Sequence, residues 1–90
     1  MTEIIRAASA GTLESSDVYV EIEPRTQGLE LQLESVVLGQ FGGAIEAAVR
    51  EILAQFQVEN ARLHVVDRGA LDCVIRARVE TAILRGKGDN

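Results

Sequence analysis

Two stretches of the chain alternate apolar and polar residues with a period of two. Residues 18–23 read VYVEIE and residues 29–34 read LELQLE. This alternation is typical of β-strands with one buried and one solvated face. Pro24 ends the first stretch. The short polar segment RTQG between them predicts that the second strand folds back on the first as a hairpin.

The period then changes to that of a helix. Apolar residues recur on one helical stripe at Phe41, Ile45, Ala48, Val49, Ile52, Leu53 and Phe56. Charged residues fall opposite, and Glu46 and Arg50 stand four apart in the order that stabilises a helix by about 0.2–0.5 kcal/mol. Gly42 and Gly43 weaken the first turn, so we expect a helix that becomes firm by Ala44.

The last third of the chain contains two apolar stretches on either side of the turn-forming segment DRGA, residues 67–70. This pattern predicts a second hairpin. Its return arm would place five residues on one face, namely Leu71, Cys73, Ile75, Ala77 and Val79. Residues 78–86, RVETAILRG, suit a short helix equally well.

Near the beginning, AASAGTLES can supply one more strand, with Leu13 facing inward. The chain would then turn over at ESSD and expose Ser15 and Ser16. The expected fold class is α+β: a small antiparallel sheet of four to five strands packed against one long helix, with a possible short C-terminal helix. We expect a single domain over residues 1–90, with residues 1–8 and 86–90 flexible.

Charge and composition narrow the classes of partner. The formal net charge of −5 argues against nucleic acid and anionic membranes, which require clustered basic residues. A single cysteine excludes an internal disulfide framework and a four-thiolate zinc site, which favours a reducing compartment. We find no signal-like or membrane-spanning apolar run. A cytoplasmic protein is therefore expected.

Catalytic chemistry is poorly represented. The one histidine, His64, falls on the face opposite Leu63 and Val65, as an ordinary strand residue does. Cys73 shares a predicted face with Ile75, which favours a small buried residue over a reactive thiol. We therefore expect neither a metal site nor a catalytic residue. We expect a module on which other proteins act.

Two further patterns could suggest ligand sites. The spacing of Asp67 and Asp72 does not match that of any calcium-binding loop, and both residues are interpreted as turn formers. The glycines at 39, 42 and 43 lack the Lys-Ser/Thr ending of a phosphate loop.

Three segments together carry a family resemblance: AGTLESSDV, QFGGAI and DRGALDCVIRARVETAI. From about Ala10 to Arg85 the chain resembles the acyl carrier protein, or gamma subunit, of bacterial citrate lyase. In that family the serine that ends GTLES bears a 2′-(5″-phosphoribosyl)-3′-dephospho-coenzyme A group through a phosphodiester. The resemblance implies Ser15 as the attachment residue. It also implies a carrier that presents acetyl and citryl thioesters to a transferase (alpha) and a lyase (beta) subunit, after loading by a prosthetic-group transferase.

The chain departs from the family pattern at Ser16, where glycine is expected. This leaves Ser16 as an alternative attachment residue and raises the question of the backbone geometry there. Glu14 and Asp17 bracket the serines and are interpreted either as partner-recognition charges or as solvated turn residues. Arg76 and Arg78, placed opposite Ile75 in the predicted last strand, could contact phosphates or lie on a solvated face.

Three other functions remain open. The carrier subunit of malonate decarboxylase resembles the chain more weakly and uses a similar group. A structural or interaction subunit without a covalent group would exploit the open edges of a small sheet. A free-standing enzyme is the remaining alternative.

Overall fold

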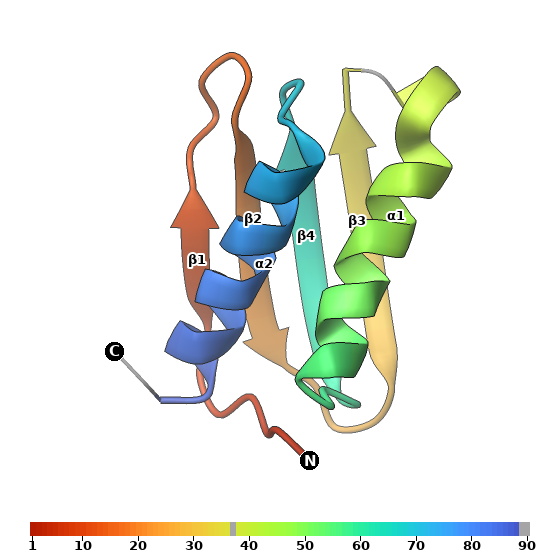
Figure 1. Ribbon diagram of the computed structural model, residues 1–90. Coiled ribbons are helices and arrows are strands. Elements are labelled where there is room, and N and C mark those ends of the chain that lie inside the picture. The colour runs from red at the N-terminus through yellow and green to blue at the C-terminus, as the bar shows by residue number, and fades with distance from the viewer. Residues whose placement is uncertain (37, 89–90) are drawn as a thin grey trace.

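The described residues form a four-stranded sheet and two helices (Figure 1). The computed structural model describes residues 1–36 and 38–88, and for residues 38–42 it describes the backbone only. The elements are β1 (Ala8–Gly11), β2 (Val18–Pro24), β3 (Leu29–Ser35), α1 (Leu38–Gln55), β4 (Ala61–Asp67) and α2 (Asp72–Gly86). The predicted α+β class is confirmed, with the C-terminal helix present and longer than expected.

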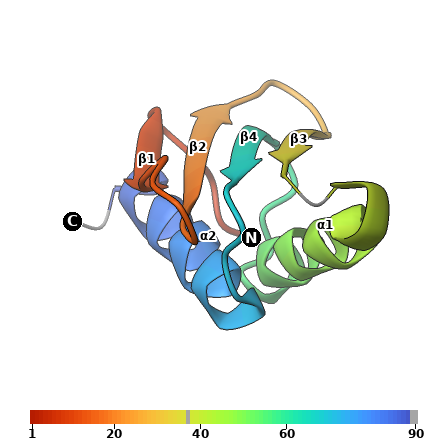
Figure 2. The same cartoon turned by 90° about the horizontal axis from the view of Figure 1, so that it is seen from above.

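The sheet has two very different faces. Both helices cover one face and leave the other open (Figure 2). The covered face carries the buried core residues of the strands: Ala10, Val18, Val20, Ile22, Ala61, Leu63 and Val65. Polar residues such as Glu21 and His64 alternate with them, so the period of two assigned the strand faces correctly.

The predicted hairpin of β2 and β3 is wrong. The strand order is β1-β2-β4-β3, so β4 lies between them, antiparallel to β2 and parallel to β3. In this central position Leu63 and Val65 are fully buried, whereas the leucines of β3 are half-buried at the edge. The segment RTQG instead crosses the start of β4, where the Ala61 amide donates to the Gly28 carbonyl at 3.1 Å.

The second predicted hairpin is also wrong, because its return arm is α2. The buried residues of this helix are Ile75, Val79, Ala82, Ile83 and Gly86, which form one helical stripe. Leu71, Cys73 and Ala77, which the strand interpretation placed inward with Ile75 and Val79, are exposed. Cys73 is therefore not the buried residue that the alternation predicted.

The helix over the middle of the chain agrees with its sequence pattern. Ile45, Ala48, Val49, Ile52 and Leu53 are buried, and Phe56 packs against them from just beyond the helix end. The Arg50 Nε atom lies 2.8 Å from Glu46 Oε2, as their spacing predicts. The helix already begins at Leu38 and not near Ala44, and the side chain of Phe41 lies outside the described part.

The two ends of the chain meet at one edge of the fold. Ile4 is buried, and the Ile5 amide donates to the Gly86 carbonyl at 2.9 Å. Residues 89–90 of the tail that we expected to be flexible lie outside the described residues. Within the described part of the chain, no helix has the length and apolar character needed to cross a membrane.

Candidate functional site

The turn that joins β1 to β2, residues 12–17, carries both serines. Ser15 and Ser16 are exposed, as the sequence predicts. Figure 1 shows the turn between β1 and β2 at one end of the sheet. Leu13, expected to face inward, leaves 54% of its surface exposed, because β1 ends at Gly11 and Leu13 already belongs to the turn. The turn thus presents hydroxyl groups and one aliphatic side chain to solvent.

Ser16 has a left-handed backbone with a φ of 66°. This region is costly for residues with a Cβ atom and is where glycine is favoured. The conformation lets the Ser16 amide donate to the Arg68 carbonyl at 2.8 Å. Glycine, which the resemblance leads us to expect at this place, would adopt the same geometry without strain, whereas serine keeps the turn at some cost in strain.

Asp17 anchors the C-terminal side of the turn through its carboxylate. Thr12 Oγ1 donates to Asp17 Oδ2 at 2.7 Å, and the Val18 amide donates to Oδ1 at 2.7 Å. The Arg78 guanidinium of α2 adds two bonds, from Nε to Oδ1 at 3.2 Å and from Nη2 to Oδ2 at 3.1 Å. The carboxylate therefore ties the turn to itself and to the helix layer.

These contacts stabilise the charged form of Asp17. The Thr12 hydroxyl, the Val18 amide and then the Arg78 guanidinium hold the pKa of Asp17 at about 2, against the opposing effect of burial. The side chain of Asp17 is only 15% exposed and holds the turn together, so Asp17 is not the solvated turn residue that the sequence suggested. Glu14 remains exposed beside Ser15.

The low pKa of Asp17 predicts an acid-sensitive turn. A carboxylate whose pKa is lower in the folded state contributes stability that is present above about pH 4 and is lost as the pH falls through about 2. We expect Asp17→Asn to lower the thermal midpoint at neutral pH, with the difference from the wild type closing toward about pH 2. Thermal denaturation followed by circular dichroism measures this. Glu14→Gln, an exposed change in the same turn, is the control, and a difference that persists unchanged at low pH would contradict the assignment.

The backbone of the turn rests on the segment that follows β4. The Arg68 amide donates to the Asp17 carbonyl at 2.9 Å, which complements the bond from Ser16 to Arg68. The next residues, 69–72, lead into α2. The serines are thus held on both sides, by their own strand pair and by the connection from β4 to α2.

Gly11 permits the close approach at the start of the turn. Its φ is 92°, and a Cβ atom built there would lie 1.9 Å from the Val18 carbonyl oxygen and 3.3 Å from Arg78 Cδ. Any side chain at this position would displace the backbone on which Asp17 and the serines depend.

The other candidate residues lie away from the serines or are engaged in structural contacts. His64 is on the open face, hydrogen-bonded to Glu34 and 3.6 Å from Glu21. Asp67 is buried and accepts hydrogen bonds from the Ser35 hydroxyl at 2.7 Å and the Ala70 amide at 2.9 Å, consistent with its interpretation as a turn former. Arg76 pairs with Asp72 at 2.6 Å and with Glu51 at 2.9 Å, so its charge is used between the helices.

Sequence reasoning missed the roles of Asp17 and Arg78 in holding the turn. Asp17 had a usable signal, since an aspartate between a turn and a strand often accepts hydrogen bonds from nearby backbone amides. Arg78 had none, because it lies 61 residues along the chain from Asp17 and was assigned to a strand.

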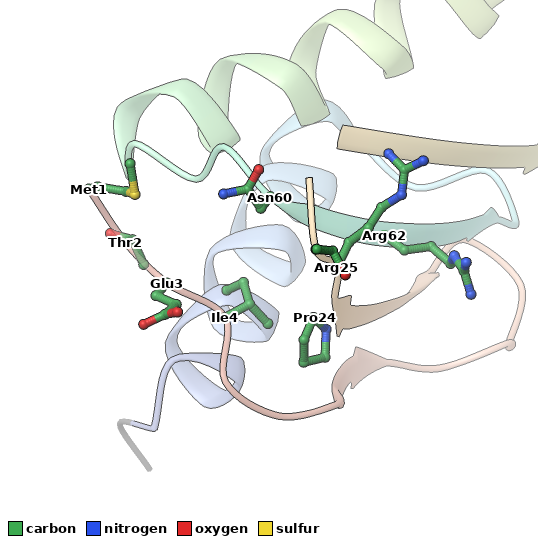
Figure 3. A pocket seen from close by; sticks show the side chains of 9 residues that line it. Met1, Thr2, Glu3, Ile4, Pro24, Arg25, Asn60 and Arg62 are labelled. Carbon is green, nitrogen blue, oxygen red and sulfur yellow. The ribbon is translucent and has the colours of Figure 1, made fainter. Parts of the chain in front are cut away.

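A hollow of about 510 Å³ lies at the opposite end of the sheet from the serines (Figure 3). The N-terminal segment, Pro24 and Asn60 line it, and so do Arg25 and Arg62. Both arginines form ion pairs with Glu30, at 3.7 Å and 3.5 Å. The full length of β2, from Val18 beside the serine turn to Pro24 at the hollow, lies between the two, so the hollow is not part of the site.

Comparison with known proteins distinguishes between the two carrier families. The family model described as malonate decarboxylase delta subunit (MdcD) matches residues 5–86. The chain is 56% identical over 84 residues to citrate lyase acyl carrier protein 2 of Salmonella typhimurium, covering 92% of this chain and 87% of that protein. It is 58% identical over 79 residues to the citrate lyase acyl carrier protein of Klebsiella pneumoniae, covering 87% and 81%. The chain belongs to the family of citrate lyase acyl carrier proteins.

A solved structure supports the fold of this acyl carrier protein. A chain in the crystal structure of a Pseudomonas malonate decarboxylase hetero-tetramer in complex with malonate superposes with a TM-score of 0.81. That match covers 93% of this chain and 87% of the other at 21% identity. At this identity the likeness shows that the two chains share a fold.

Proposed function

We propose that this acyl carrier protein bears a covalent prosthetic group on Ser15 and serves as the carrier subunit of a citrate lyase, without a catalytic step of its own. The observation that carries the proposal is the exposed Ser15 side chain in a turn whose backbone is fixed on both sides. An exposed hydroxyl is accessible to a modifying enzyme, and a fixed backbone presents it in a defined place.

The proposed group is 2′-(5″-phosphoribosyl)-3′-dephospho-coenzyme A, joined to Ser15 through a phosphodiester. When bound, it supplies a thiol that holds acetyl or citryl groups as thioesters. The turn fits this group, because the charge of a phosphodiester stays solvated at an exposed serine. Arg68 is exposed and its backbone bonds to Ser16 and Asp17, so its long side chain starts close enough to the turn to reach and neutralise a phosphate on Ser15. Arg76 and Arg78, which the sequence also offered for this role, are used in ion pairs.

The protein's own contribution is to tether and to present. A tethered substrate meets successive active sites at high effective concentration and is not released between steps. The proposed partners are the transferase (alpha) and lyase (beta) subunits of citrate lyase and the prosthetic-group transferase. The net charge of −5 favours basic surfaces on these partners.

Intact-mass spectrometry tests the proposal on protein produced with and without the prosthetic-group transferase. We expect the mass to increase by that of one group only when the transferase is present, and Ser15→Ala to abolish the increase. Ser16→Gly is the matched control, because it removes the neighbouring hydroxyl while glycine readily adopts the φ of 66° found there.

Each other outcome has a defined meaning. Loading of Ser15→Ala together with loss of loading in Ser16→Gly would move the attachment to Ser16. A wild-type protein that the transferase never modifies would instead favour an interaction subunit without a covalent group. Loading by the transferase of a malonate decarboxylase, but not by that of a citrate lyase, would favour the related carrier.

A further inference from the structure

A cavity of about 330 Å³ opens at the same end of the sheet as the serine turn. It lies between the N-terminal parts of the two helices and the connection from β4 to α2. Its lining residues are Ala44, Ile45, Asp67, Gly69, Ala70, Asp72 and Ile75. Most of these side chains are aliphatic, and the volume lies at the lower end of the range for small-molecule pockets, about 300–1,000 Å³.

One segment of chain separates the cavity from the serine turn. Arg68 bonds to Ser16 and Asp17 through its carbonyl and amide, at 2.8 Å and 2.9 Å. The residues on either side of Arg68, namely Asp67 and Gly69, line the cavity. The turn and the connection from β4 to α2 also lie side by side at this end in the ribbon view (Figure 1). A single backbone is about 5 Å wide, so a flexible arm attached at Ser15 needs to cross only this connection to reach the cavity.

We propose that the cavity receives the acetylated thiol end of the group attached at Ser15 and shields the thioester from water between transfers. This inference rests on the proposed function, and it adds a resting place for the acyl load. The aliphatic walls formed by Ala44, Ile45, Ala70 and Ile75 suit an acetyl thioester, which is small and uncharged.

The carboxylates that line the cavity favour an acetyl group over an acyl group that bears carboxylates. Its ionisable lining residues are Asp67 and Asp72, and no basic side chain is among the described residues that line it. Asp72 is paired with Arg76 at 2.6 Å, whereas Asp67 accepts hydrogen bonds from neutral donors. Like charges repel, so the two carboxylates disfavour a citryl end and leave it exposed for a lyase subunit.

Nuclear magnetic resonance of the loaded protein tests this proposal. The ¹⁵N-labelled protein is first shown by mass to carry the group, and then compared with a free thiol, an acetyl thioester and a succinyl thioester at its end. We expect the acetyl form to shift the backbone amides of Ala44, Gly69 and Ala70 relative to the thiol form. The succinyl form, whose load bears a carboxylate, should match the thiol form at these positions.

Two helix variants make the test specific. Ala44→Leu fills the cavity mouth from an exposed helix position, and Ala47→Leu is the matched control on the same helix, exposed but outside the cavity. Ala44→Leu should abolish the acetyl-dependent shifts and raise severalfold the rate at which hydroxylamine cleaves the acetyl thioester. Ala47→Leu should change neither.

The inference and the proposed function fail in different ways. A protein that cannot be loaded at all overturns the proposed function. A protein that loads normally, but whose cavity amides do not respond to acetylation or whose thioester is cleaved equally fast in Ala44→Leu, overturns the inference alone.

Discussion

A citrate lyase complex assembled with the Ser15→Ala carrier is expected to cleave no citrate above background. In the proposed mechanism every acyl transfer passes through one tethered thiol, and alanine removes the single atom to which the tether is joined. Without the tether, no thiol carries acyl groups between the active sites, because no free carrier replaces it. Oxaloacetate formation by complexes reconstituted with wild-type and variant carriers measures the effect.

The control for this prediction is again Ser16→Gly, which keeps the turn conformation and should retain activity close to that of the wild type. Circular dichroism should show that Ser15→Ala is folded, since the residue is exposed and its replacement removes no buried contact. Citrate cleavage by the Ser15→Ala complex at a rate comparable to the wild type would reject Ser15 as the attachment residue.

Gly11→Ala is expected to lower the free energy of unfolding by about 2–4 kcal/mol. The added Cβ would lie 1.9 Å from the Val18 carbonyl oxygen, and the φ of 92° is strained for any residue with a side chain. The contact is with backbone, so relief requires the end of β1 and the start of β2 to separate. That movement would also disturb the bonds between Asp17 and Arg78.

Urea denaturation measures this change, and Gly43→Ala serves as its control. Gly43 lies within α1, and a Cβ there would meet no atom within 4 Å. Alanine should therefore stabilise the helix by about 0.5–1 kcal/mol. Equal stabilities of Gly11→Ala and the wild type would show that the turn can rearrange without cost, and the site geometry described above would then be wrong.

The amino-acid pattern was sufficient for every element whose period is unambiguous. The alternation in residues 18–23 and 29–34 gave two strands and their faces, and the stripe from Ile45 to Leu53 gave the buried side of α1. Periodicity failed in α2, because Ile75 and Val79 fit an alternating pattern as well as a helical one. Ala82 and Ile83 continue the helical stripe, and they are the residues that distinguish the helical pattern from the alternating one.

Strand pairing was beyond the reach of the pattern. Alternation predicts which face of a strand is buried, but it does not predict which strand lies next to it. A four-residue link between two strands favours a hairpin, yet β4 takes the central place because it can bury Leu63 and Val65 completely there. The helical crossover through α1 makes the parallel pairing of β3 with β4 possible.

The sequence by itself determined the α+β class, the exposed turn with Ser15, and the family resemblance that the comparisons confirmed. Only the tertiary structure decided how that turn is held and what lies beside it. Asp17 and Arg78 are 61 residues apart in the sequence, and the cavity joins Ala44 of one helix to Ile75 of the other. Local periodicity reports which face of an element is buried, whereas contacts between distant residues exist only once those faces have packed together.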